Sequence, residues 1–366
     1  MRRVWRQSWP TIALVASIAI VVVLCLLAST TSGAALVGRH ARAPGDASGQ
    51  ARTLVRRGTT VAVDPTAGRL YAALQRGTSA RDTLERLDPE RGRVLARRDL
   101  GGTFDAGVSF DGSLWVVSTS YTRRSSTLAL WRLDPSSLAV DSRQELPGSR
   151  GALDVHQPLA GAGGRLWLAY GDRLVRIDPS AGTLGAPRHI ARAQELGIAA
   201  AAGGRVLLLS AATDFGRGWI EERDPVTGAF ERSSRTFLGV HQPGVGGTYA
   251  GRLWVAEATG MMGYVEAISV RTLQSLRTPA PRRLGTNGID GRVVGGTLFV
   301  TDGGVTHPNY CGSPVTGAPR ALLPAVVRHG GWVGAIARGR IYVVARAQRG
   351  ASSGPLLSAP VPAGCR

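Results

Sequence analysis

Three of the six histidines lie at similar distances before a recurring glycine. His156, His241 and His329 precede such a glycine by eight, ten and ten residues, respectively. An imidazole can ligate a divalent metal or transfer protons near neutral pH, so the three are candidate catalytic residues. Alternatively, each one hydrogen-bonds the backbone of a neighbouring loop. We predict no cofactor and assign no metal site, and we keep a divalent metal as the alternative.

The recurring glycine opens a motif that is found seven times, at spacings of 40 to 52 residues. The glycine is followed by a variable residue, a branched apolar residue and a bulky apolar or aromatic residue. A period in the mid-forties matches four short strands and their turns, which is one propeller blade. We therefore predict an all-β, seven-bladed β-propeller of four-stranded antiparallel blades. The copies begin at Gly68, Gly112, Gly164, Gly204, Gly251, Gly296 and Gly339.

The second hairpin of four units has an Asp-Pro turn, at Asp88, Asp134, Asp178 and Asp224. In such a turn the Asp side chain accepts amide hydrogen bonds and Pro fits the first corner, so we expect these carboxylates to be structural. The fifth unit has Ser269 at this position. The bulky residue of each motif is expected to fill the gap between adjacent blades. The seventh unit lacks a fourth strand, which Arg52 to Arg57 can supply by closing the ring.

In a propeller, the connections between blades and the loops after each second strand lie on one face, around the mouth of the central channel. Ligands usually bind there, so polar residues in these segments are candidate ligand-binding residues. The alternative is a polar rim without reactivity. The candidates are Asp105, Glu195, Glu257, Asn287, Asp302, His307 and Tyr310.

The segment Val61-Ala62-Val63-Asp64-Pro65, the Gly-Arg-Leu-Trp cores and the Arg-Leu/Ile-Asp-Pro turns resemble the seven-bladed propellers of the YVTN/NHL and virginiamycin-B-lyase-like type. The resemblance covers roughly residues 52 to 366 and implies the fold. We expect a membrane-anchored bacterial protein, and an actinobacterial one. It implies little about activity, because the group includes lyases, ligand sensors and cell-surface binding proteins. Its lyases hold a His base and metal-binding acidic residues together in one late blade, and this sequence has no such cluster.

The N-terminal region predicts export. Residues 1–10 form a basic tail expected in the cytoplasm, and residues 11–28 are uncharged and long enough for a transmembrane helix or signal-anchor. Residues 29–51 form a flexible linker, and residues 52–366 form the propeller. We expect a single-pass protein of the bacterial cytoplasmic membrane, with the propeller on the extracellular side. The alternative is secretion after cleavage of a signal peptide near Ser32-Gly33-Ala34.

Outside the cell, cysteines tend to pair, and Cys311 and Cys365 are the only two beyond the apolar segment. We predict a disulfide between them, with two free thiols as the alternative. The formal charge is +19, and all 44 basic residues are Arg. Anionic lipid or an anionic cell-wall polymer is therefore a candidate partner, besides the membrane itself. We expect no nucleic-acid partner outside the cytoplasm.

No Gly-x-Ser-x-Gly elbow, phosphate-binding loop with Lys or Cys-x-x-Cys motif is present. The sequence therefore favours a binding or scaffold module over an enzyme, with an unknown protein or small ligand at the channel mouth. The alternative function is a lyase or hydrolase that uses one of the three histidines with a nearby carboxylate. Metal analysis of the protein separates the two.

Overall fold

The computed structural model describes seventeen segments of the propeller region, and all of them belong to one compact unit, Ser48–Arg366. The segments are 52–58, 60–64, 68–75, 81–121, 126–146, 158–190, 195–200, 204–211, 217–234, 237–238, 244–259, 262–277, 283–284, 289–302, 308–324, 332–344 and 354–365. Within these segments no helix is long and apolar enough to cross a membrane. The predicted membrane segment, residues 11–28, lies outside them.

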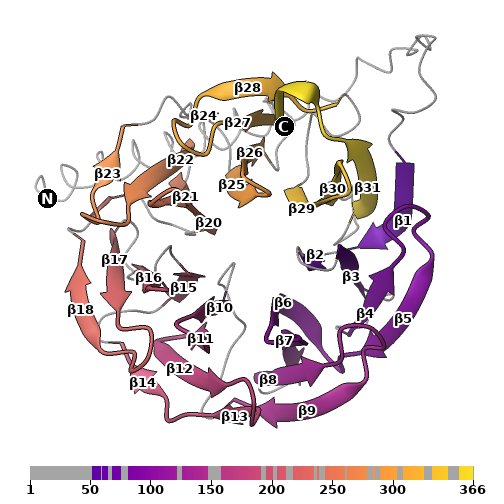
Figure 1. Cartoon of the computed structure of the whole chain (residues 1–366), viewed down its shortest axis with the longest axis horizontal. Coiled ribbons are helices and arrows are strands. Elements are labelled where there is room, and N and C mark those ends of the chain that lie inside the picture. Colours follow the sequence, from indigo (N-terminus) through magenta and orange to yellow (C-terminus); the bar gives the residue numbers. More distant parts are fainter. Residues whose placement is uncertain are drawn as a thin grey trace, which may run out of the picture. The chain divides into compact units, whose positions relative to one another are not determined.

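The described strands form seven antiparallel sheets arranged as blades around a ring (Figure 1). Blade 1 consists of β2 (Thr60–Asp64), β3 (Arg69–Gln75), β4 (Asp82–Leu87) and β5 (Val94–Asp99). Blade 2 consists of β6 (Thr103–Phe110), β7 (Ser113–Tyr121), β8 (Ser126–Leu133) and β9 (Val140–Glu145). Blade 3 consists of β10 (Leu159–Ala162), β11 (Arg165–Tyr170), β12 (Arg173–Asp178), and an outer strand in two pieces, β13 (Thr183–Leu184) and β14 (Arg188–His189).

Blades 4 and 5 also have an outer strand in two pieces. Blade 4 consists of β15 (Glu195–Ala200), β16 (Val206–Ala211), β17 (Arg217–Arg223), β18 (Phe230–Ser233) and β19 (Phe237–Leu238). Blade 5 consists of β20 (Gly244–Tyr249), β21 (Arg252–Thr259), β22 (Met262–Ser269), β23 (Ser275–Leu276) and β24 (Arg283–Leu284). Blade 6 consists of β25 (Ile289–Val294), β26 (Thr297–Asp302), β27 (Tyr310–Gly312) and β28 (Pro319–Leu322).

Blade 7 joins the two ends of the chain. It consists of β29 (Trp332–Ala337), β30 (Arg340–Val344), β31 (Gly354–Pro360) and, as its outer strand, β1 (Arg52–Gly58). The antiparallel pairing places Arg52 opposite Ser358 and Gly58 opposite Gly354. The prediction that the residues before the first inner strand complete the last blade is confirmed. A short 3-10 helix, η2 (Ala363–Cys365), follows β31.

The recurring glycine takes a left-handed backbone conformation at the hairpin between the first and second strand of each blade. Its φ lies between +61° and +76° in all seven copies. The residue before it, where described, also has positive φ in blades 2, 3, 5, 6 and 7, as in the two-residue type I′ hairpin. Gly avoids the steric cost of this conformation, which explains why the motif keeps it.

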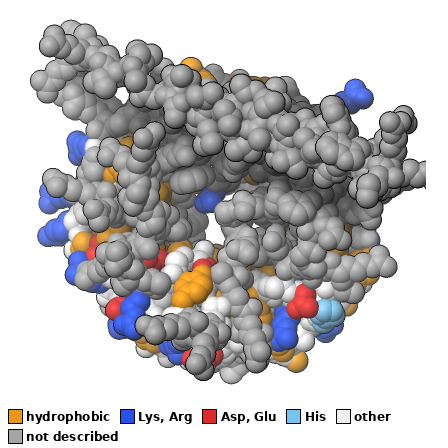
Figure 2. Space-filling model, turned by 180° about the vertical axis from the view of Figure 1, so that it is seen from behind, with side chains coloured by type: hydrophobic (Ala, Val, Ile, Leu, Met, Phe, Trp, Pro, Cys, Tyr) orange, Lys and Arg blue, Asp and Glu red, His pale blue; other side chains and the backbone are white. Residues whose placement is uncertain are grey.

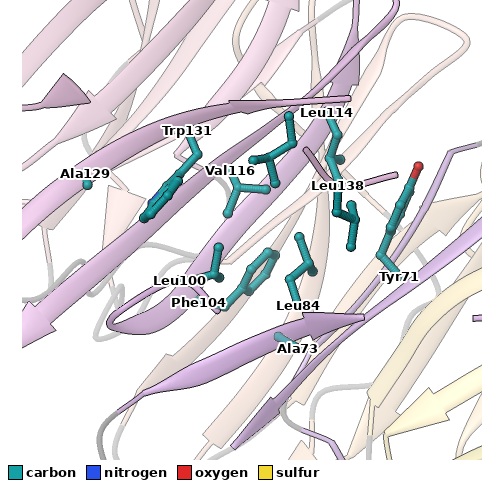
Figure 3. Close-up of a cluster of buried hydrophobic side chains, with 11 residues drawn as sticks. Tyr71, Ala73, Leu84, Leu100, Phe104, Leu114, Val116, Ala129, Trp131 and Leu138 are labelled. Atoms are coloured by element: carbon teal, nitrogen blue, oxygen red, sulfur yellow. The ribbon is translucent and has the colours of Figure 1, made fainter. Parts of the chain in front are cut away.

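The core consists of seven clusters of buried apolar residues, one between each pair of neighbouring blades. Figure 3 shows the cluster between blades 1 and 2, where Tyr71 and Leu84 face Phe104, Val116 and Trp131. The bulky motif residue is at most 1% exposed in every blade, so the prediction that it fills the gap between blades is confirmed. These residues are Tyr71, Trp115, Trp167, Leu207, Trp254, Phe299 and Tyr342.

Four of these residues also donate a hydrogen bond across the gap. The acceptor is always the carbonyl of the Pro in the second turn of the next blade. Each bond therefore fixes the angle between two blades as well as filling the space between them. The pairs are Tyr71 to Pro135 (2.8 Å), Trp167 to Pro225 (3.0 Å), Trp254 to Pro314 (2.9 Å) and Tyr342 to Pro89 (3.0 Å).

Antiparallel order divides the turns of each blade between two faces. The hairpins between strands 1 and 2 and the turns between strands 3 and 4 share one face, which we call the hairpin face. The loops between strands 2 and 3 and the connections between blades share the other face, which we call the connection face. The candidate ligand-binding residues were predicted for the connection face.

Candidate binding site on the connection face

The strands place several predicted site residues at the connection face. Glu195 is the first residue of β15 and Asp302 is the last residue of β26, and both strand ends point to this face. Glu257 is the third residue from the end of β21, opposite Tyr264. Asn287, His307 and the three candidate catalytic histidines, His156, His241 and His329, lie outside the described residues.

Tyr310 lies in the core and not on the rim. It is the first residue of β27, but its side chain is only 4% exposed and packs with Trp254, Val265 and Val300 in the cluster between blades 5 and 6. Its prediction as a surface ligand-binding residue therefore needs correction. A tyrosine at a strand end also fits an apolar gap between two sheets, and the sequence pattern does not distinguish the two uses.

Asp105 is the best-defined candidate on the connection face. It occupies a β-bulge near the start of β6, the innermost strand of blade 2, between Phe104 and Ala106. Its carboxylate accepts a hydrogen bond of 2.7 Å from the Thr119 hydroxyl on β7. The side chain is half-buried.

A second carboxylate, Asp82, lies beside Asp105 and was not singled out in the sequence. It begins β4 and is buried, and its side chain accepts a 2.8 Å hydrogen bond from the backbone N–H of Phe104. Its own N–H donates to the carbonyl of Gly102 at 2.8 Å. Asp82 thus ties the connection between blades 1 and 2 to blade 1.

The same connection packs tightly on blade 2. A Cβ atom on Gly102 would lie 2.3 Å from the Thr119 carbonyl oxygen, so only glycine fits there. Leu100 and Phe104, on either side, belong to the core cluster of Figure 3. The two carboxylates are therefore held on a rigid part of the rim.

Burial governs the protonation of this pair. Desolvation raises the pKa of Asp105 to about 7, the Thr119 hydroxyl opposes that shift, and the negative charge of Asp82 adds to it. Burial also raises the pKa of Asp82, against the opposing effect of the Phe104 N–H. Near neutral pH, Asp105 can therefore donate as well as accept a hydrogen bond.

One histidine is described next to a carboxylate, and it lies on the outer strand of blade 3. Nδ1 of His189 on β14 is 2.8 Å from a carboxylate oxygen of Asp172, and Arg173 Nε is 3.7 Å from the other oxygen. Figure 2 shows acidic, basic and histidine side chains side by side at the edge of the ring. Within the described segments, no group of three or more His, Cys, Asp and Glu side chains could hold a metal ion.

The carboxylates of the Asp-Pro turns lie on the hairpin face and serve the turns, as predicted. In each of the four turns the Asp carboxylate accepts two backbone N–H bonds. Hydrogen bonds lower the pKa of all four carboxyl groups, and the largest cause is a backbone N–H at Asp88 and Asp134 and the Ser180 or Thr227 hydroxyl at Asp178 and Asp224. Blade 6 has the same turn with Ser313, whose hydroxyl accepts the N–H bonds of Val315 and Thr316. The sequence analysis did not identify this sixth turn, although Ser313-Pro314 and Gly317 carry its signal.

Cys311 and Cys365, the pair for which we expect a disulfide, are bonded to each other. Their Cα atoms are 5.7 Å apart, and both side chains are buried between blades 6 and 7. The bond joins β27 to η2, and the Thr297 hydroxyl on β26 donates to the Cys365 carbonyl at 2.7 Å. The C-terminal residues thereby take the place of the missing second turn of blade 7.

No protein-family profile matches this chain, and no curated protein matches it. Its fold is similar to that of many solved structures. Kuenenia stuttgartiensis hydrazine synthase aligns with a TM-score of 0.58 at 11% identity, over 85% of this chain and 96% of that one. The β-propeller domain of Myceliophteria thermophila Swd1 aligns with a TM-score of 0.57 at 12% identity, over 86% and 100%.

BBS1N, in complex with ARL6DN, aligns with a TM-score of 0.57 at 12% identity, over 87% of this chain and 97% of that one. At such identities the likeness concerns the fold and not the function. Together with the seven closed sheets, it shows that the chain is a seven-bladed β-propeller.

Proposed function

We propose that this chain is an extracytoplasmic, membrane-anchored binding module whose protein or small-ligand partner binds the connection face. The observation that carries the proposal is the Asp82–Asp105 pair. A carboxyl group with a pKa near 7 on an innermost strand is costly to keep, and such perturbed groups cluster at functional sites. Asp105 recognises a partner through hydrogen bonds, in either protonation state.

The rest of the ring supports a scaffold role. Side-chain hydrogen bonds join neighbouring blades near the hairpin face. The strand ends that carry Glu195, Glu257 and Asp302 project from this frame to the connection face. Loops positioned by a rigid scaffold are the usual location of binding residues in β-proteins.

Photo-crosslinking tests the binding face. Tyr121 ends β7 at the connection face and is 49% exposed, whereas Phe230 begins β18 at the hairpin face and is 54% exposed. An aromatic photo-crosslinker replaces either residue conservatively. In cells that make the protein, we expect a discrete adduct from position 121 that the additional Asp105→Asn change weakens, and none from position 230. An equal yield of the same adduct from both positions would contradict the proposal.

The disulfide supports an oxidising compartment for the propeller, and residues 11–28 supply a segment of the length needed for an anchor. Thiol labelling of the freshly lysed protein in denaturant tests this location, because Cys311 and Cys365 are buried in the folded ring. An exported chain has one reactive thiol, Cys25, before reduction and three after it. Three reactive thiols before reduction would place the propeller in the cytoplasm, and loss of Cys25 from the mature chain would indicate a cleaved signal peptide.

A further inference from the structure

The chain enters the ring at the hairpin face. Arg52 begins β1 and pairs with Ser358, close to the end of β31. That end lies at the hairpin face, because Pro360 pairs with Arg340, the first residue after the last hairpin. The linker before it has 23 residues, 29–51. A flexible chain of that length has a root-mean-square span of about 26 Å. An anchor in residues 11–28 would therefore tether the ring through β1, the strand that begins at the hairpin face.

One sector of the hairpin face exposes apolar and basic side chains together. On blades 4 to 6, Val226, Tyr249 and Val315 are 48%, 40% and 41% exposed. Arg252 and Arg271 lie among them, in the hairpin and the second turn of blade 5. We call these five residues the docking patch.

Contacts between blades hold blades 4, 5 and 6 together in this sector. Arg232 of blade 4 donates to the carbonyls of Val270 and Arg271 in blade 5. Trp254 of blade 5 donates to Pro314, the neighbour of Val315 in blade 6. A Cβ atom on Gly296 of blade 6 would lie 3.6 Å from the Tyr249 ring of blade 5.

Four of the five docking-patch residues lie in blades 5 and 6, where the turns of the hairpin face have no carboxylate, and Val226 lies in the second turn of blade 4, next to Asp224. Blades 1 to 4 each have an Asp in the second turn, and Glu90 of blade 1 adds a further negative charge, paired with Arg338. Blades 5 and 6 have Ser269 and Ser313 instead, and neither their hairpins nor their second turns contain an acidic residue. In blades 5 and 6 the sector is therefore positively charged as well as apolar.

We propose that the docking patch binds the anionic lipid headgroups of the membrane that anchors the chain. The inference rests on the anchor of the proposed function. Arg252 and Arg271 contact lipid phosphates, Tyr249 lies at the level of the headgroups, and the two valines cover the polar-apolar boundary. Each contact is weak, but the linker keeps the patch at high effective concentration beside the bilayer.

This arrangement has a consequence for partner binding. The connection face, which carries Asp105, lies at the opposite ends of the strands from the docking patch. With the patch on the lipid, the connection face is turned away from the bilayer and is open to a partner from the outside.

Spin labels on the full chain in lipid nanodiscs test the docking. With Cys25→Ser, a label at Thr272→Cys reports on the docking patch, and one at Ser136→Cys reports on the corresponding turn of blade 2; both positions are exposed. A nickel chelate attached to lipid headgroups relaxes labels close to the membrane. In discs with phosphatidylglycerol we expect severalfold stronger relaxation at position 272 than at 136. The difference should fall at high salt.

Two double variants make the test specific. Tyr249→Ser with Arg271→Glu should abolish the difference. The control, Arg91→Glu with Val140→Ser, likewise reverses one positive charge and removes one exposed apolar side chain, but on blades 1 and 2. It should leave the difference in relaxation intact. Equal relaxation at the two positions, or the same difference in discs of phosphatidylcholine alone, would overturn the docking inference and leave the anchor standing.

A chain that does not remain with the discs would overturn the anchor instead. The docking inference would then be judged by cosedimentation of the full chain with phosphatidylglycerol vesicles at low salt. Loss of sedimentation in the Tyr249→Ser, Arg271→Glu variant would support it. Equal sedimentation with phosphatidylcholine vesicles would overturn it.

Discussion

At the scale of single residues, the gaps between blades show a balance of volumes. The second turn of a blade ends on a left-handed residue that faces the bulky motif residue of the preceding blade. Opposite Trp167 this residue is Gly228, whereas Leu138 and Leu273 stand in the turns that face Tyr71 and Leu207. In these three gaps a smaller partner is accompanied by a larger turn residue, despite the cost of positive φ for leucine. The turn that faces Tyr342 ends instead on Gly92, which packs against Leu54.

This balance predicts different costs for the same substitution at two turn glycines. A Cβ on Gly228 would lie 2.6 Å from the Trp167 ring, whereas a Cβ on Gly182 meets its nearest atom, Ser142 Oγ, at 3.4 Å. Both have positive φ, so Gly182→Ala should cost about 1 kcal/mol and Gly228→Ala about 3 kcal/mol. Urea unfolding of the two variants measures the difference. Equal costs would mean that the gap between blades 3 and 4 tolerates extra volume.

Asp105 predicts a pH dependence of stability. Its folded-state pKa is about 7 and its ordinary value is 3.8, so between these values the folded state binds more protons than the unfolded state. Its contribution to stability therefore falls as the pH rises from about 4 to about 7. Asp105→Asn removes the buried charge and keeps an oxygen for Thr119. The free energy of unfolding of the variant, relative to that of the natural protein, should therefore rise by on the order of 2 kcal/mol as the pH goes from 5 to 8.

Unfolding in urea at several pH values checks this expectation. Asp111→Asn, at an exposed hairpin position, is the matched control and should give a curve parallel to that of the unsubstituted protein. A parallel curve for Asp105→Asn as well would show that this carboxyl group is not buried as described.

At the scale of elements, the junction between blades 4 and 5 is one of three that lack, among the described residues, a bond from the bulky motif residue to a Pro carbonyl. The bulky motif residue of blade 4, Leu207, has no hydrogen-bond donor in its side chain, and the facing turn of blade 5 has Val270 in place of Pro. Here Arg232 spans the gap, and its guanidinium donates hydrogen bonds to the carbonyls of Val270 (3.1 Å) and Arg271 (2.6 Å). Glu222, buried in β17, holds Arg232 at 2.6 Å and Arg205 at 2.7 Å. A charged network thus replaces the bond between aromatic residue and Pro carbonyl.

Removing the charge of Glu222 should therefore weaken the junction. Glu222→Gln leaves two arginines without their carboxylate and loosens the bridge to blade 5, at a cost of about 2 kcal/mol. Glu85 is equally buried, and the described part of the chain pairs it only with Arg97 of the same blade. It is the matched control, and Glu85→Gln should cost about 1 kcal/mol. Urea unfolding compares them, and a larger loss for Glu85→Gln would contradict a role for Arg232 between blades.

The sequence predicts elements better than the contacts between them. The glycine period identifies all seven hairpins, because positive φ at a type I′ turn leaves a visible residue signature. The network at Glu222 has no such signature, since its charges come from two separate strands and act on backbone carbonyls. Asp82 was missed for the same reason, because only the fold brings the start of β4 beside β6. Tyr310 was assigned to the rim because strand position alone does not specify burial.

At the scale of the whole molecule, the closure of blade 7 connects the two ends of the chain. β1 pairs along β31 from Arg52 to Gly58, and a Cβ on Gly92 of blade 1 would lie 2.8 Å from the Leu54 carbonyl oxygen. The first strand therefore belongs to both blade 7 and the junction with blade 1. The segment that would link the ring to a membrane is continuous with the strand that closes it.

This closure is the central claim, because both faces and every proposed surface depend on one intact ring. Thermal unfolding of two truncated chains tests it most directly, one lacking residues 1–50 and one lacking residues 1–58. The first keeps β1 and should melt with the full chain. The second exposes an edge of β31 and should melt at a temperature lower by about 10 °C or more, since losing a whole strand removes several kcal/mol. Identical melting of the two truncated chains would contradict the closed ring.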